Sequence, residues 1–137
     1  MSQRCIDKCK CLHLQSRKIK IDKAEYHPID DDVYLFFINT ESYYDAVVIR
    51  FANNTINTIH SGTFNTLNPD RGVRTFNHDI HFWGGSVEAE NPINVEFVSG
   101  TVIISNICFS KIKINFSFIT EKGDEVKGAY DGTIVGR

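Results

Sequence analysis

The sequence predicts a single all-β domain, built either as an antiparallel β-sandwich or as a lipocalin-like barrel of about eight to ten strands. Residues 111–118 alternate polar and apolar side chains without a fault, which is the period of a strand with one buried face. Turn signals recur about every eight to twelve residues along the chain. No window of about eleven residues or more shows a helical period.

The size and charge of the chain restrict its class. Its 137 residues fit one domain, and a hydrophobic content of 42% excludes general disorder. The formal net charge of -2 argues against a dedicated nucleic-acid binder, which would present a basic face. No stretch approaches the ~20 apolar residues of a membrane-spanning helix. We therefore expect no nucleic-acid partner and no membrane-spanning segment.

The first half of the chain provides three strands after a tail. We expect residues 1–16 to be a flexible tail and residues 17–137 to form the domain. Residues 17–26 alternate and predict a strand that Pro28 ends, because proline cannot donate a ladder hydrogen bond. Residues 33–40 are apolar on both faces and predict a central strand, and residues 45–52 predict the next.

The middle of the chain predicts shorter strands. One or two short strands are expected over residues 56–64, and another over residues 75–83, which the Gly84–Gly85 pair would end. Further strand candidates are residues 87–90, 95–98 and 101–104, with Gly100 as a bulge or bend.

The last two strands form a hairpin. Residues 112–118 and 125–135 are joined by a loop in which Gly123 supplies the left-handed conformation. Gly128, Gly132 and Gly136 recur every fourth residue and so share one face of the last strand with Tyr130. We interpret them as structural glycines that let the strand bend or let large aromatic rings pack over it.

The cysteines are distributed unevenly. Cys5, Cys9 and Cys11 crowd the start of the chain and, with His13, offer the ligands of a soft metal, but their spacing matches no common zinc motif. We interpret them as part of a solvated tail and expect no metal or other cofactor. Cys108 lies in a strand and is expected to be buried. No apolar signal segment precedes the domain, so the sequence alone favours neither the cytosol nor export.

Several short motifs carry a resemblance. These are Lys23–Tyr26, Val33–Phe36, His60–Phe64, Val98–Ser105 and, above all, the glycine-spaced segment Gly123–Ile134. In this order they resemble the small all-β domains of unknown function in exported lipoproteins of gut Bacteroidetes. The resemblance implies a compact sandwich or lipocalin-like barrel at the cell surface or in the periplasm, without assigned chemistry. The residues around Cys5 depart from the family, because Gln3-Arg4-Cys5 is not a lipobox.

Two polar clusters are the only candidates for chemistry. In a strand, Asp79 and His81 would share one face and His78 would lie opposite, so the histidines would not converge on a metal. A hydrolase that uses Asp79 and His81 lacks a recognisable nucleophile. Residues 30–32 are three aspartates that lack the ligand spacing for calcium and predict a solvated turn. We therefore predict that the protein is not an enzyme and has no metal site.

Aromatic side chains near turns are the best candidates for binding. Tyr43 and Tyr44 lie in a connection, and Trp83 precedes two glycines. Such aromatics stack on sugars or anchor a protein partner, although Trp83 also suits the core. We predict a non-enzymatic binding or surface-display module with an unknown glycan or protein partner. The alternatives are a lipocalin-like carrier of a small apolar ligand, and a subunit of a larger assembly that would expose a strand edge.

Overall fold

A computed structural model describes residues 16–41, 46–66, 77–88 and 95–137, and within these residues it contains strands and no helix. The all-β class is therefore confirmed. The strands are β1 Ser16–Ile19, β2 Lys23–Ile29, β3 Asp32–Ile38, β4 Ala46–Phe51, β5 Gly62–Thr66, β6 His81–Phe82, β7 Gly84–Glu88, β8 Val95–Cys108, β9 Lys111–Thr120 and β10 Glu125–Gly136.

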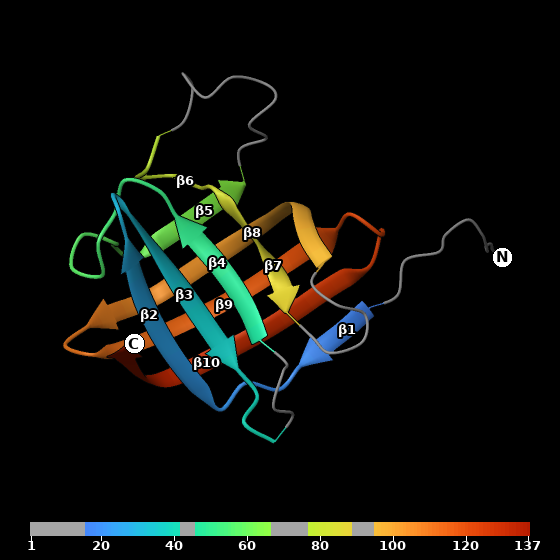
Figure 1. Cartoon of the computed structure of the whole chain (residues 1–137), viewed down its shortest axis with the longest axis horizontal. Coiled ribbons are helices and arrows are strands. Elements are labelled where there is room, and N and C mark those ends of the chain that lie inside the picture. The colour runs from blue at the N-terminus through green and yellow to red at the C-terminus, as the bar shows by residue number, and fades with distance from the viewer. Residues whose placement is uncertain (1–15, 42–45, 67–76, 89–94) are drawn as a thin grey trace, which may run out of the picture.

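Seven of these strands close into a barrel. The ring runs β10-β2-β3-β4-β7-β8-β9 and returns to β10. In Figure 1, β2, β3, β4 and β7 lie in front and cross over β8, β9 and β10 at a steep angle. The ring closes where β10 pairs in parallel with β2, whereas the other ring pairs are antiparallel. The barrel is confirmed, and the purely antiparallel arrangement is wrong, because closure uses a parallel pair.

Three strands lie outside the ring. β1 pairs in parallel with the start of β10, and β5 pairs with β8 on the side away from β9. The short β6 then pairs in parallel with β5. The length of β8 and β10 allows this branching. On the edge away from β9, β8 pairs with β7 at its start and with β5 farther along, and β10 pairs with β1 at its start and with β2 at its end.

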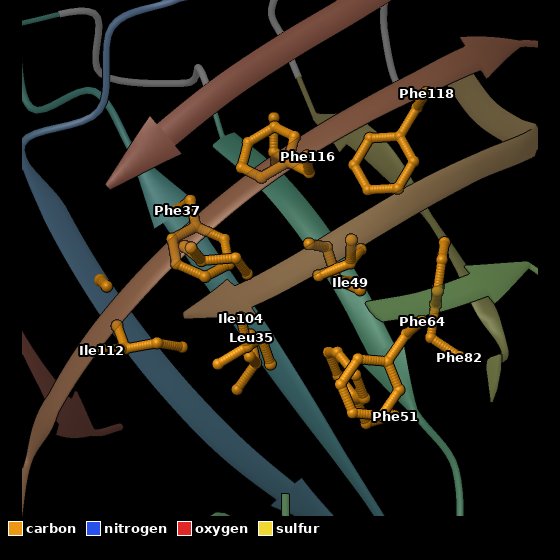
Figure 2. Packing of buried hydrophobic residues seen from close by; sticks show 14 of the residues in the cluster. Leu35, Phe37, Ile49, Phe51, Phe64, Phe82, Ile104, Ile112, Phe116 and Phe118 are labelled. Carbon is orange, nitrogen blue, oxygen red and sulfur yellow. The ribbon is translucent and has the colours of Figure 1, made fainter. Parts of the chain in front are cut away.

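Phenylalanine rings from six strands form the core of the barrel, and Figure 2 shows most of them. Phe118 stacks on Phe97 with ring centroids 3.9 Å apart, and it meets Phe82 edge-on at 5.6 Å. Phe51 meets Phe64 edge-on at 5.3 Å. Aromatic rings of this size bring a large apolar area out of water and pack well at such separations. The core is thus a continuous aromatic cluster that spans both layers.

The strand predicted over residues 17–26 is divided into β1 and β2, because the Asp22 side chain bonds to Thr40 and takes the chain out of the ladder. Its carboxylate accepts hydrogen bonds from the backbone N–H of Thr40 at 3.0 Å and from the Thr40 hydroxyl at 2.7 Å. These bonds hold the pKa of the Asp22 carboxyl below its usual range. The chain therefore leaves β1 at Ile19 and enters β2 at Lys23. Ile21 is partly buried and packs against the core.

Pro28 does not end β2, which was the expectation. It lies opposite Val33 in the β2–β3 ladder, and the turn comes later, at Asp30, whose φ is 54°. Proline is tolerated here because β10 pairs with β2 only at residues 24–26, so the nitrogen of Pro28 can face an unpaired edge.

The strand candidates 95–98 and 101–104 are one strand, β8, interrupted by a bulge. The register shifts between Phe97 and Ser99, which makes Val98 the extra residue. Before the bulge the odd-numbered Phe97 is buried, and after it the even-numbered Val102 and Ile104 are buried. The bulge was expected at Gly100, but it lies two residues earlier and reverses the inward face of the strand.

The glycine pair 84–85 lies inside a strand, which contradicts its expected role as a break. Gly85 is opposite Ile49 in the β4–β7 ladder, and a Cβ there would lie 1.9 Å from the carbonyl oxygen of Val48. Gly84 has a φ of 129°, a conformation that other residues rarely adopt. Gly85 is thus needed for β7 to approach β4 closely, and Gly84 is needed for the backbone conformation at the start of β7.

The C-terminal hairpin agrees with the sequence. β9 and β10 pair along nearly their whole length, and Gly123 in the connection has a φ of 85°. A Cβ on Gly128 would lie 2.4 Å from the ring of Phe116, and one on Gly136 would lie 3.1 Å from the ring of Tyr26. Aromatic rings do pack over these glycines, which confirms their structural role.

Cys108 is exposed, although it was expected to be buried. It is the last residue of β8, next to a two-residue turn at Phe109 and Ser110 that projects from the end of the barrel. A position at the end of a strand lies beyond the core, whatever the alternation of the strand.

The strands expected over residues 56–64 and 75–83 are largely replaced by turns. Residues 55–58 form a turn in which the Thr58 hydroxyl accepts a hydrogen bond from the Thr55 N–H at 2.7 Å. In the part of these segments that the structure describes, only Gly62–Thr66 and His81–Phe82 are strands. Side-chain hydrogen bonds to the backbone compete with the ladder, which is typical of segments rich in Asn and Thr.

Candidate binding groove

An open hollow lies on the outer face of the barrel, over β3, β4 and β7. It is an open groove of about 740 Å³. Its lining comes from five strands of the ring (β2, β3, β4, β7 and β8), from β5, and from Trp83 between β6 and β7. The lining residues are Ile29, Tyr34, Phe36, Val48, Arg50, Thr66, Trp83, Gly84, Gly85, Ser86, Glu88, Glu96, Phe97 and Val98. We refer to this hollow as the outer groove.

The floor of the outer groove is apolar because the outward-facing residues of the central strands are apolar. Tyr34 lies opposite Arg50, Phe36 opposite Val48, and Val48 opposite Ser86 in successive ladders. Phe36 and Val48 face outward, yet they are only 9% and 5% exposed. The sequence signal was present: residues 33–40 are apolar on both faces. We interpreted that pattern as a central strand and missed that its outer face lines a groove.

Trp83 lines the outer groove and lies outside the buried core. Its backbone N–H donates to the carbonyl of Arg50 at 2.8 Å, which extends the β4–β7 ladder by one residue. Its indole ring is half-buried, and the guanidinium carbon of Arg50 lies 5.6 Å from the ring centroid. The core interpretation of Trp83 is therefore wrong. The prediction that it contacts a ligand remains a prediction.

Arg50 is held between aromatic rings at one end of the outer groove. Its guanidinium carbon is 5.7 Å from the centroid of the Tyr34 ring, in addition to its contact with Trp83. Its Nε donates to a carboxylate oxygen of Asp32 at 2.8 Å. The other Asp32 oxygen accepts from the N–H of Asn53 at 3.1 Å. Asp32 thus anchors the arginine, which the expectation of a solvated aspartate turn did not foresee.

A second arginine lies over the ring of Phe36 on the same face of the sheet. The guanidinium carbon of Arg137 lies 4.0 Å from the centroid of the Phe36 ring, and its Nε donates to Glu25 at 3.0 Å. Cation–π contact at this distance is favourable, more so where water is partly excluded. This contact explains in part why an outward-facing phenylalanine is nearly buried.

The other wall of the outer groove is acidic and apolar. Glu96 lies opposite Ser86, and Glu88 follows Ser86 by two residues on the same face of β7. Val98, the bulged residue of β8, is 54% exposed. Bulges re-aim side chains, and here the bulge places an apolar side chain at the rim. Sequence reasoning missed these residues, because register across β4, β7 and β8 is a property of the assembled sheet.

Tyr43 and Tyr44, the other predicted binding residues, lie outside the described residues. Their role in binding stays a prediction.

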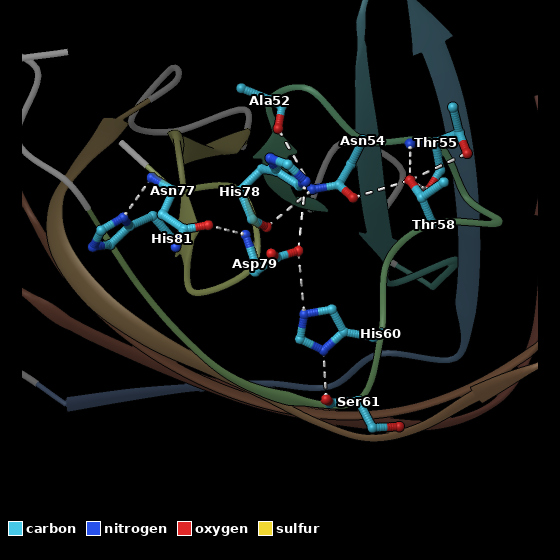
Figure 3. Close-up of polar contacts among 10 residues, drawn as sticks. All are labelled: Ala52, Asn54, Thr55, Thr58, His60, Ser61, Asn77, His78, Asp79 and His81. Carbon is cyan, nitrogen blue, oxygen red and sulfur yellow. Dashed lines mark hydrogen bonds and ion pairs between the residues drawn. The ribbon is translucent and has the colours of Figure 1, made fainter. Parts of the chain in front are cut away.

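The histidine-rich cluster differs from the strand that was expected there. Residues 78–80 form a turn, so the alternation that would place Asp79 and His81 on one face is absent. Figure 3 shows the Asp79 carboxylate near the imidazole rings of His78 and His60. It lies 3.5 Å from Nε2 of His78 and 3.8 Å from Nε2 of His60. Nδ1 of His81 accepts from the backbone N–H of Asn77 at 3.0 Å. The strand geometry that suggested the hydrolase alternative is therefore absent, and the absence of enzymatic activity stays a prediction.

This cluster fastens two turns to each other. Asn54, only 4% exposed, donates through Nδ2 to the carbonyl of His78 at 3.2 Å and accepts from the Thr58 hydroxyl at 3.0 Å. His60 is bonded through Nδ1 to the carbonyl oxygen of Ser61 at 2.7 Å. Over the ranges that the structure describes, no group of His, Cys, Asp and Glu has the arrangement of a metal site. We interpret the cluster as a structural network.

The chain matches no protein-family profile, no curated protein and no solved structure. The resemblance to exported lipoproteins of Bacteroidetes therefore stays a prediction. None of the described residues forms a helix long and apolar enough to cross a membrane.

Proposed function

We propose that this protein is a non-enzymatic binding module whose binding site is the outer groove. The observation that carries the proposal is the combination of an open groove of about 740 Å³ with exposed apolar residues on its rim. Val98 and Ile29 are 54% and 41% exposed at this site. Exposed apolar side chains beside charged ones on a rigid scaffold are the usual composition of a binding surface.

The framework of the groove supports this proposal. All of its floor comes from paired strands of the closed ring, so the side chains are held by a ladder on both sides. A site on paired strands needs little ordering when a ligand binds, which lowers the entropic cost of association.

The structure gives less support to the carrier alternative. Its ligand would occupy the interior of the barrel, where Phe37 and Phe116 lie 5.8 Å apart and Phe82 and Phe118 lie 5.6 Å apart. A ligand there would have to displace rings that contact one another (Figure 2). Such a displacement opens a cavity at a cost of several kcal/mol per large side chain. The outer groove is therefore the better candidate.

The test is a binding selection with a matched pair of variants. A random peptide library displayed on phage and an array of oligosaccharides are both selected against the protein, and selected ligands are titrated while the fluorescence of Trp83, the single tryptophan, is recorded. We expect Val98→Ser to weaken binding about tenfold. Ile103→Ser is the control, because Ile103 is 45% exposed on the same strand and does not line the groove.

Either of two results would overturn the proposal. In the first, neither library yields a ligand that competes with itself. In the second, the selected ligands bind Val98→Ser and Ile103→Ser equally well and leave the fluorescence of Trp83 unchanged.

A further inference from the structure

The protein's own cations already occupy part of the outer face. Arg50 lies between the rings of Tyr34 and Trp83 and pairs with the carboxylate of Asp32. The guanidinium group thus has two kinds of partner at once, an aromatic ring and a carboxylate. Together these partners replace the water that the guanidinium loses.

The same arrangement occurs again on the neighbouring strands. Arg137 lies over the ring of Phe36 and pairs with Glu25. Arg50 and Arg137 come from different segments, and each uses an aromatic ring of β3 together with an acidic side chain of β2 or β3. This face of the sheet is therefore suited to cationic side chains at two places.

A third place on this face has the acidic partners without a cation. Glu88 and Glu96 line the outer groove on β7 and β8, and within the described residues neither forms an ion pair with a basic side chain. Both lie beside Ser86, Glu96 directly opposite it and Glu88 two residues along β7. Diagonal neighbours of this kind have Cα atoms ~7–8 Å apart, which allows two carboxylates to contact one cationic group.

Apolar surface surrounds these two carboxylates. Val48 forms the floor next to Ser86, and Val98, which is 54% exposed, lines the groove two residues after Glu96. The methylene groups of a lysine or arginine side chain would cover this surface while the charged end reaches the carboxylates. The site thus fits a long cationic side chain better than a small inorganic cation.

We propose that the outer groove binds a basic segment of a partner protein and takes up a lysine or arginine side chain between Glu88, Glu96 and the apolar floor. This inference rests on the proposed function and adds the chemistry of the partner. Charge complementarity carries it, because the cation would complete the one acidic part of the groove that the protein's own arginines leave unpaired in the described residues.

An oligosaccharide fits the groove less well. Sugars bind aromatic side chains by stacking on a ring face. Arginines already lie over the rings of Tyr34, Phe36 and Trp83. A glycan would have to displace a guanidinium group that is also held by Asp32 or Glu25, whereas a basic segment leaves both arginines in place.

The experiment uses two synthetic peptides and the full chain. One is a six-residue peptide of alternating glycine and arginine, blocked at both ends, and the other has citrulline in place of arginine, which keeps the shape and removes the charge. Binding is measured by calorimetry and by the fluorescence of Trp83. We expect the arginine peptide to bind about tenfold more tightly than the citrulline peptide, and its affinity to fall as salt is raised.

Charge variants locate the binding site. Glu88→Gln combined with Glu96→Gln should weaken the arginine peptide about tenfold and remove the preference over citrulline. The control is Glu125→Gln combined with Asp131→Asn, which removes the same charge from β10, away from the groove, and should leave the affinity unchanged. Thermal unfolding of each variant verifies that the fold is kept.

The two proposals fail in different ways. If both peptides bind equally, or if both pairs of charge variants weaken binding equally, the basic-segment inference is wrong. The proposed function still stands in that case, provided that a ligand selected from the libraries distinguishes Val98→Ser from Ile103→Ser. If no selected ligand makes that distinction, the groove is not a binding site and both proposals are overturned.

Discussion

At the residue scale, single atoms decide how closely the strands of this barrel approach. Gly85 is the clearest case, because the carbonyl oxygen of Val48 occupies the place where a Cβ would be. Gly100 is similar, with a Cβ position 2.3 Å from the ring of Phe118. These glycines are needed because neighbouring strands or rings leave no room for a side chain, so substitution must move backbone or core.

The first prediction concerns Gly85. Gly85→Ala should reduce the free energy of unfolding by about 3 kcal/mol, because the added methyl group overlaps the backbone of β4. The measurement is the midpoint of urea unfolding. Ser86→Ala, at the next residue, should change the free energy of unfolding by less than about 0.5 kcal/mol. Equal effects of the two substitutions would show that the β4–β7 distance is not limiting.

At the element scale, two hairpin connections follow different chemistry. The β9–β10 loop has Gly123 where φ is positive, as turn preferences demand. The β8–β9 turn has Phe109 and Ser110 at φ values of 49° and 66°, where asparagine and glycine are preferred. Phe109 is also 95% exposed, so its ring does not compensate by packing. This turn should therefore reduce the stability of the fold.

The second prediction is a gain of stability at this turn. Phe109→Asn combined with Ser110→Gly should raise the free energy of unfolding by about 1 kcal/mol, since both positions then suit a left-handed backbone. Gly123→Ala is the reciprocal control and should lower the free energy of unfolding by a similar amount. The readout is the denaturant midpoint at unchanged slope. A loss of stability in the double variant would mean that Phe109 contributes contacts in the folded state.

At the scale of the whole molecule, the ring depends on a short parallel ladder. Residues 134–136 of β10 pair with residues 24–26 of β2, and in the described residues the other direct ladder between the two layers of the ring is that of β7 with β8. Ile134 and Ala24, opposite each other in this ladder, are 2% and 1% exposed. Closure thus buries apolar surface as well as two sheet edges.

The third prediction tests closure. A chain that stops after Thr133 lacks this ladder, and we expect it to lose cooperative unfolding and to bind a hydrophobic dye, because two edges and part of the core are opened. Val135→Thr keeps the ladder and changes only an outward side chain that is 44% exposed. It should unfold as the original chain does. Cooperative unfolding of the shortened chain at the same midpoint would show that the pairing of β7 with β8 holds the layers together without closure.

Local pattern was sufficient for the strands that lie between well-marked turns. β3, β4, β9 and β10 are close to their predicted ranges, since alternation and apolar content depend on the residues of the strand itself. Local pattern gave wrong predictions at Pro28, at Val98 and at residues 78–80. In these places an unpaired edge, a bulge and side-chain hydrogen bonds outweighed the preference of the segment. One predicted site residue, Trp83, lies in the outer groove. The sequence did not predict the other groove residues Arg50, Glu88 and Glu96.

The amino-acid pattern was enough to predict the all-β class and the final hairpin, because both follow from the period of side chains along one strand. The tertiary structure alone decided the parallel closure between β2 and β10, the reversal of the inward face along β8 and the outer groove. The physical reason is that register between strands distant in the sequence depends on the packing of the complete core. A groove that spans several strands is formed by that register, and no single segment encodes it.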